Sequence, residues 1–163
     1  MRGDRQRGFS LIELLIVVAI ILIIASIAVP NFMRSRLAAN QASALESMRN
    51  IGTAEVGYST TYGATFSTSL AALGPPPAGQ EASSTAAGLL DEVLASGLKS
   101  GYTFSYTPSL YNSITNTWNG YTLLGTPTTY GETGQMYYYS DQTFLIRANS
   151  TTTASATDTA VGD

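Results

Sequence analysis

Apolar residues form one unbroken block near the start of the chain. Within residues 9–29 the only charged side chain is Glu13, and the next charge is Arg34. As a helix this block is about 30 Å long, which matches the hydrocarbon core of a bilayer. An ionised carboxylate there is costly unless it is paired, protonated or able to reach the interface. The pattern predicts a membrane-length helix in which Glu13 needs a partner.

A second helical pattern follows Pro30, with apolar positions that recur every seven residues. Leu37, Ala44, Ile51 and Tyr58 follow this spacing, and Leu45 and Met48 widen the stripe. The charged residues of the same segment mostly occupy other positions: Arg34, Arg36, Glu46, Arg49 and Glu55. The spacing predicts an amphipathic helix over residues 31–62 whose apolar face is covered by the rest of the chain. Because proline lacks a backbone donor, we expect a kink or local break at Pro30.

The remainder predicts a small α/β head. Residues 63–84 are loop-like and end in a run of three prolines between Gly74 and Gly79. Residues 86–98 predict a short helix that Ser84 or Thr85 caps and Gly97 terminates.

Alternating apolar and polar residues then predict strands. These strands lie at residues 102–106, 121–124, 136–139 and 143–147, with a turn at residues 140–142. The fold class that follows is α+β: a long helix packed against an antiparallel sheet of three or four strands. Residues 149–163 are rich in Thr, Ala and Ser and predict a mobile tail.

Three interpretations of the first residues compete. A secretory signal peptide could be cut after Ser26-Ile27-Ala28, but its apolar run is too long and Glu13 is out of place. A simple single-pass anchor explains the length but explains neither Gly8 nor Glu13. A leader that ends at Gly8 leaves Phe9 as a new N-terminus on an intact helix.

The segment Arg7-Gly8-Phe9-Ser10-Leu11-Ile12-Glu13-Leu14 and the apolar run after it resemble the N-termini of type IV pilins and type II secretion pseudopilins. The resemblance implies a peptidase cut between Gly8 and Phe9, and methylation of the Phe9 amine by the same enzyme. It further implies that Glu13 pairs with the N-terminal amine of a neighbouring subunit, and that the helix unwinds locally near Pro30.

The chemistry of these residues agrees with the resemblance. Glycine before the cut presents no Cβ to a narrow protease site. A methylated amine keeps its positive charge, so Phe9 can still pair with a carboxylate. We interpret this pair chiefly as a device that aligns one subunit with the next, because the net stabilisation of a buried ion pair is small after desolvation.

Composition excludes several classes of function. The chain has neither Cys nor His, which removes thiol chemistry, disulfides and the commonest general base and metal ligand. We therefore expect no enzyme, no catalytic residue, no cofactor and no metal. After a cut at Gly8, five basic and ten acidic side chains remain, for a net charge of −5. This balance argues against a nucleic-acid partner.

The function that we predict is that of a prepilin, a structural subunit that polymerises from the inner membrane into a type IV pilus. Its segments are a basic leader (1–8), a membrane-spanning and filament-core half helix (9–30), an amphipathic half helix (31–62), the head (63–148) and the tail (149–163). The basic leader stays in the cytoplasm and the head faces outward.

The expected partners are other copies of the chain, a prepilin peptidase and N-methyltransferase, the pilus assembly machinery, and inner-membrane lipid before assembly. Two alternatives remain: a pseudopilin of a type II secretion system, and a secreted binding domain with an ordinary signal peptide. In the family, the major pseudopilin has a calcium-binding C-terminal region. The dispersed acids Glu132, Asp141, Asp158 and Asp163 favour turn or solvated roles instead.

Overall fold

The computed structural model describes residues 9–63 and 65–161. The chain divides into two compact units, Met1–Arg36 and Leu37–Asp163, and helix α1 (Leu11–Tyr62) begins in the first and ends in the second. The helix ends at Tyr62, where the predicted amphipathic helix over residues 31–62 also ends. The helix is continuous with Pro30 inside it, so the chain has no break in α1 at that residue. Local unwinding during assembly stays a prediction.

The second unit contains an antiparallel sheet whose strands follow chain order. The strands are β1 (Leu98–Lys99), β2 (Tyr102–Asn112), β3 (Thr117–Pro127), β4 (Tyr137–Asp141), β5 (Arg147–Asn149) and β6 (Thr159–Ala160). The α+β fold class and the antiparallel pairing are confirmed. The expected number of strands is wrong, because this sheet has six, and β2 and β3 are longer than the alternation predicts.

The strand expected at residues 143–147 is also displaced. Phe144 donates its N–H to the Asp141 carbonyl at 2.9 Å, which closes a turn one residue later than expected. Phe144 has a φ of 61°, a left-handed conformation that cannot continue a strand. Pairing with β4 therefore resumes only at Arg147.

The helix expected over residues 86–98 is wrong for most of its length. Gly88 has a φ of +68°, which interrupts any helix there. Ala87 and Leu90 donate their N–H groups to the carbonyls of Ala72 and Leu73, at 2.8 and 2.9 Å, rather than to helical partners. This segment lies along α2 (Leu70–Leu73), a helical turn inside the region expected to be loop.

Only α3 (Glu92–Ala95) is helical in the segment. Its cap is Asp91, whose Oδ1 accepts the Leu94 N–H at 2.9 Å, and not Ser84 or Thr85. Gly97 terminates the turn as expected, with a φ of +80° immediately after the C-cap residue.

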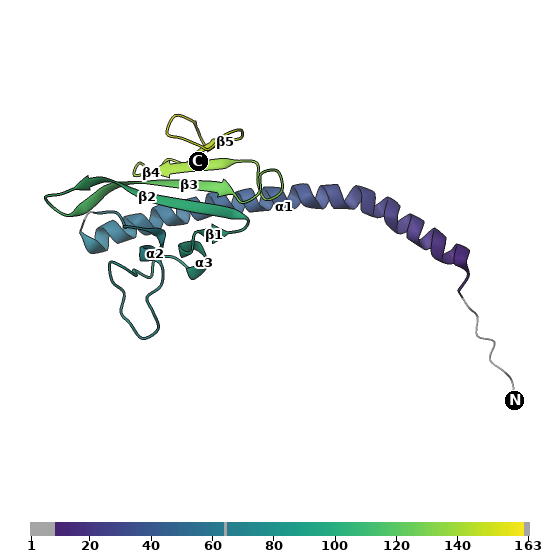
Figure 1. Cartoon of the computed structure of the whole chain (residues 1–163), viewed down its shortest axis with the longest axis horizontal. Helices are drawn as coiled ribbons and strands as arrows, with labels where there is room; N and C mark the ends of the chain where they lie inside the picture. The colour runs from purple at the N-terminus through teal and green to yellow at the C-terminus, as the bar shows by residue number, and fades with distance from the viewer. Residues whose placement is uncertain (1–8, 64, 162–163) are drawn as a thin grey trace. The chain divides into compact units, whose positions relative to one another are not determined.

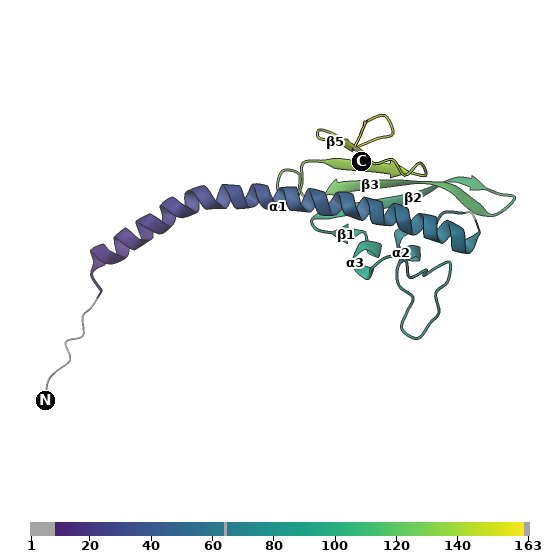
Figure 2. The same ribbon diagram turned by 180° about the vertical axis from the view of Figure 1, so that it is seen from behind.

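The core of the second unit lies between α1 and the elements on either side of it. Figures 1 and 2 show β3, β4 and β5 on one side of this part of α1, and β1, α2 and α3 on the other. The predicted stripe is confirmed: Ala44, Met48, Ile51 and Tyr58 are buried, and Leu37 and Leu45 are half-buried. The sheet contributes Tyr102, Phe104, Tyr121, Leu123 and Tyr138 to the same cluster.

The C-terminal segment corrects another expectation. Residues 149–161 do not form a mobile tail, because β6 pairs with β5 in the register Arg147↔Ala160 and Ala148↔Thr159. Val161 then donates its N–H to the Ile146 carbonyl at 2.8 Å. Backbone pairing holds this segment although its composition is polar.

Substitution of Gly134 by alanine is expected to destabilise the head by about 1–3 kcal/mol, the usual cost of overpacking. A Cβ at Gly134 would overlap the buried Tyr102 ring, whose hydroxyl donates to the Met136 carbonyl at 3.0 Å. The matched control is Gly57→Ala on α1, where a Cβ would meet Leu89 at an ordinary 3.7 Å. That variant should gain about 0.5–1 kcal/mol. Urea unfolding of the full chain in detergent measures both, and a stable Gly134→Ala variant would contradict this packing.

Candidate functional site

The start of α1 and the residues just before it include two of the four residues that the sequence singles out, Phe9 and Glu13. Phe9 is 83% exposed and precedes the helix. Glu13 accepts the backbone N–H of Ser10 through Oε2 at 2.9 Å, which satisfies a donor that the helix start leaves free. Gly8 lies outside the described residues. In a single copy, therefore, the Glu13 carboxylate caps its own helix.

Between Leu14 and Val29 the helix of the first unit carries no charge and is apolar around its circumference. All of its large side chains before Pro30 are exposed, from Leu11 at 81% to Val18 at 46%. By length and composition this stretch could cross a membrane, and none of its most apolar window is buried in the chain. A helix that is apolar all round needs lipid or other helices around it. Pro30 lies several turns beyond Glu13, so the predicted residues form no single site in one copy.

A buried carboxylate is the functional group that sequence reasoning missed. Glu55, expected among the charged positions outside the stripe, is 0% exposed. Its Oε2 accepts the Ser67 N–H at 3.0 Å, and its Oε1 accepts the Ser67 hydroxyl at 2.5 Å. Glu55 follows Met48 by seven residues, the spacing of the stripe itself. This spacing could have identified Glu55 as a buried position, but its charge argued for an exposed one.

Two tyrosines from the sheet face this carboxylate. Tyr106 donates its hydroxyl to the Ser67 carbonyl at 3.1 Å, and Tyr106 and Tyr121 stack with ring centroids 5.3 Å apart. Burial, and next the charge of Glu55, raise the pKa of both hydroxyls far above the usual value for tyrosine. Both rings therefore stay neutral, and the cluster joins α1 to β2 and β3.

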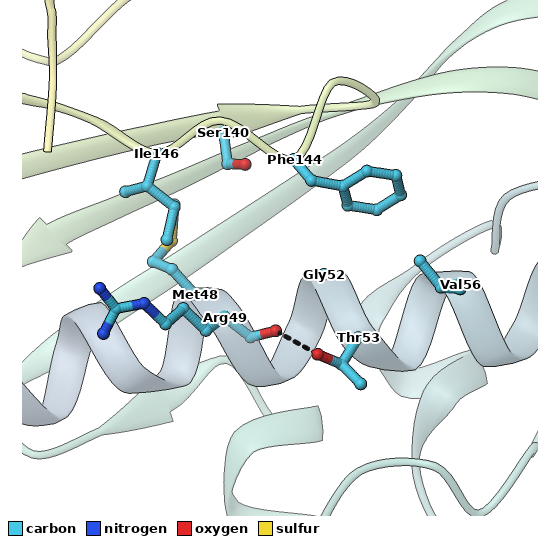
Figure 3. Close-up of a pocket in the computed structure, with 8 residues that line it drawn as sticks. All are labelled: Met48, Arg49, Gly52, Thr53, Val56, Ser140, Phe144 and Ile146. Atoms are coloured by element: carbon cyan, nitrogen blue, oxygen red, sulfur yellow. Dashed lines mark hydrogen bonds between the residues drawn. The ribbon is translucent and has the colours of Figure 1, made fainter. Parts of the chain in front are cut away.

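A shallow groove of about 390 Å³ runs beside α1 in the second unit. In Figure 3, Phe144 and Ile146 lie on the sheet side, with Arg49, Gly52 and Val56 on the helix side. Thr53 donates its hydroxyl to the Arg49 carbonyl at 3.0 Å and thereby stays within its own helix. The groove is mainly apolar, with one cation at its edge.

Two of the dispersed acids, Asp141 and Asp158, take the turn roles that the sequence favours, and Glu132 is exposed. Asp141 Oδ1 accepts the N–H and the hydroxyl of Thr143, at 2.9 and 2.6 Å. Asp158 accepts the Asn149 amide at 2.8 Å, and the Ser155 N–H and hydroxyl at 2.7 and 3.0 Å. Asp163 lies outside the described residues. The carboxylates of Asp141 and Asp158 hold the conformation of their own segments.

Loss of the Asp158 contacts is expected to free the last strand. Hydrogen bonds from the Ser155 backbone and from Asn149 hold the pKa of Asp158 below its ordinary value. Because this pKa is lower in the folded chain than in the unfolded chain, where it is about 4, the ionised carboxylate stabilises the fold above about pH 4. That stabilisation is lost as the pH falls through the folded-state pKa. The protection of the Val161 amide against hydrogen exchange, relative to its intrinsic rate at each pH, should fall at pH 7 in Asp158→Ala, but in the parent chain only below about pH 4. The exposed Glu81→Ala is the control and should leave it unchanged.

Comparison with known proteins found a family model and a curated protein to which part of this chain is similar. The family model described as the prokaryotic N-terminal methylation motif matches residues 3–29. The "Type IV major pilin protein PilA" of Myxococcus xanthus (strain DK1622) is 47% identical over 53 residues. That alignment covers 32% of this chain and 24% of the relative's length.

No solved structure matched the chain. The matched segment contains the exposed apolar helix, and the chain continues into an antiparallel head on the same helix. The chain therefore carries a prokaryotic N-terminal methylation motif, is similar over part of its length to a type IV major pilin, and has an α+β fold in which a long N-terminal helix precedes an antiparallel sheet.

Proposed function

We propose that this chain is a structural subunit that is cleaved between Gly8 and Phe9, methylated on the Phe9 amine and polymerised into a type IV pilus. A prepilin peptidase with N-methyltransferase activity performs the processing, and a separate assembly machine supplies the force. Before assembly the first half of α1 crosses the inner membrane and the head faces outward. The chain acts by self-association and has no enzymatic role.

The observation that carries this proposal is the exposure of the first half of α1. From Leu11 to Val29, its large apolar side chains are 46–81% exposed in the chain alone. A helix that leaves the bilayer keeps this surface away from water only among other such helices. Other copies of the same chain supply them.

The geometry of Glu13 supports a contact between copies. Its carboxylate lies in an apolar segment and, among the residues that the structure describes, makes one hydrogen bond, to the Ser10 N–H. An ionised carboxylate accepts several hydrogen bonds, so capping leaves it able to accept a donor from elsewhere. In the filament the methylated amine of a neighbouring Phe9 fills that role. Pro30 gives α1 a position with one missing donor, at which the helix unwinds locally.

The intact mass of the mature protein tests the processing step. We expect the mass of a chain that starts at Phe9 and carries one additional methyl group. A start at Val29 would identify an ordinary signal peptide and overturn the proposal in favour of a secreted domain. A start at Met1 would show that the leader is retained and that no processing takes place.

The pilus is favoured over a short pseudopilus by the relative, whose name is that of a major pilin. Electron microscopy of cells that express the chain tests this choice. Extracellular filaments that contain the chain support the pilus. Loss of protein secretion on deletion, without visible filaments, would support a pseudopilin of a type II secretion system.

A further inference from the structure

The loop between β3 and β4 presents a rigid aromatic and acidic surface. Tyr130 is 53% exposed and Glu132 is exposed beside it. Tyr130 stacks on Tyr137 with centroids 5.8 Å apart and donates its hydroxyl to the Ser150 carbonyl at 2.8 Å. Gly131 donates its N–H to the Gly134 carbonyl at 2.8 Å, which closes the loop. Because its conformation is already held, this surface loses little entropy on binding.

The groove beside α1 has the complementary chemistry. Its exposed apolar groups are Val56 at 49% and Phe144 at 42%, and Arg49 lies at its edge. Arg49 pairs with Glu46 at 3.8 Å on the same helix, and both side chains are largely exposed. Such a surface pair contributes little, so Arg49 can exchange it for a better acid. The groove therefore fits an aromatic ring accompanied by a carboxylate.

The loop and the groove occupy different levels of the same helix. The loop is held beside Asn40, whose Nδ2 donates to the Thr133 carbonyl at 3.0 Å. The groove is centred near Gly52, which lies about 18 Å further along α1 at 1.5 Å per residue. One chain cannot bring these two surfaces together. Two chains can, if one is displaced along the helix direction relative to the other.

We propose that the loop of one copy docks in the groove of the next. The exposed face of Tyr130 covers Val56 and Phe144, and Glu132 pairs with Arg49 across the boundary. Each copy offers the loop at one level and the groove at another, so the contact is head-to-tail and builds an open filament. The proposal rests on polymerisation and specifies which head surfaces meet.

Charge complementarity selects this occupant over another exposed apolar segment of the chain. The tip of the β2–β3 hairpin presents Ile114, which is 94% exposed, between Asn112 and Asn116. That tip carries no charge, so docking it in the groove would desolvate Arg49 with no acid partner beyond its long, exposed pair with Glu46. The hairpin tip is therefore the competing occupant in the test.

Exchanged charges test the ion pair. Arg49→Glu and Glu132→Arg should each lower the yield of sheared filaments about tenfold or more, since both place like charges at the contact. The double variant Arg49→Glu with Glu132→Arg restores the opposite charges and should recover most of the yield. Glu81→Arg, an exposed charge reversal elsewhere, is the control for net charge. Two single variants with normal yield would overturn the pairing.

Introduced cysteines test the position, since the chain has none of its own. Oxidised filaments of the double variant Thr53→Cys with Glu132→Cys should give a ladder of linked multimers, whereas either single variant should not. The double variant Thr53→Cys with Ser113→Cys tests whether the hairpin tip occupies the groove instead. A ladder from that pair, or no ladder from the first, would overturn the proposed contact. If the parent chain forms no filaments, the proposed polymerisation is wrong. Oxidation of the Thr53→Cys with Glu132→Cys variant in membranes then decides separately whether two copies make this contact.

Discussion

Replacement of Glu55 by alanine is expected to lower the free energy of unfolding by about 3 kcal/mol, roughly the cost of unpaired buried donors plus a cavity. The carboxylate is fully buried and accepts both the N–H and the hydroxyl of Ser67. In the alanine variant the Ser67 N–H loses its acceptor in the interior. The connection between α1 and α2 loses its attachment to the helix at Ser67, although the sheet still holds it through Tyr106 and Trp118.

The matched variant is Glu55→Gln, which we expect to stay within about 1 kcal/mol of the parent. The glutamine oxygen still accepts the Ser67 N–H, and its amide can donate to the Ser67 hydroxyl. That hydroxyl is also 3.2 Å from the Ser69 carbonyl, so it can turn its own proton there. The chain thus keeps its hydrogen bonds while a buried charge is removed.

Urea unfolding of the full chain in detergent, followed by the fluorescence of Trp118, measures both variants. Trp118 is the one tryptophan of the chain, and its carbonyl accepts the Phe66 N–H at 2.9 Å, next to Ser67. Ser67→Ala should reproduce part of the loss and should not add fully to Glu55→Ala, because the two share the same bonds. Equal losses for the alanine and glutamine variants would show that the charge matters rather than the hydrogen bonds.

The spacing of residues predicted α1 well because one physical requirement, burial of a stripe, governs its second half. Met48 and Ile51 follow that requirement and are buried. Glu55 lies on the same stripe, but a carboxylate is seldom buried without a partner, so its charge argued for the surface. Its partner Ser67 belongs to another segment, and a single sequence gives no indication that the two meet.

The errors in the head have a common cause, which is backbone pairing between distant segments. Apolar spacing over residues 86–98 allows a helix, yet Ala87 bonds to Ala72 and Gly88 takes a left-handed conformation. β6 is held by pairing with β5 and by Asp158, although its residues are small or polar. Side-chain pattern carries no information about such pairing, which uses only N–H and carbonyl groups. The helix was therefore predictable and the C-terminal strands were not.

Replacement of Glu13 is expected to have the largest effect on assembly. The chain holds Glu13 in an apolar helix, where an ionised side chain is costly without a counter-charge. If the neighbouring amine supplies that charge, Glu13→Ala should still insert in the membrane and be cleaved, because it removes a charge from an apolar segment. We expect filament yield to fall more than about tenfold, since the amine then enters the bundle unpaired.

Glu13→Gln separates the two roles that the carboxylate can play. Its amide oxygen can still accept the Ser10 N–H, so the cap on the helix is kept, while the charge is lost. Quantitative immunoblots of sheared filaments against total cellular protein compare the variants, with Leu14→Ala as the control for lost apolar surface. Assembly of Glu13→Gln as poor as that of Glu13→Ala would assign the role to the ion pair between copies. Normal assembly of the glutamine variant would instead show that Glu13 acts by capping its own helix, and the register of the filament would then depend on the contacts between heads.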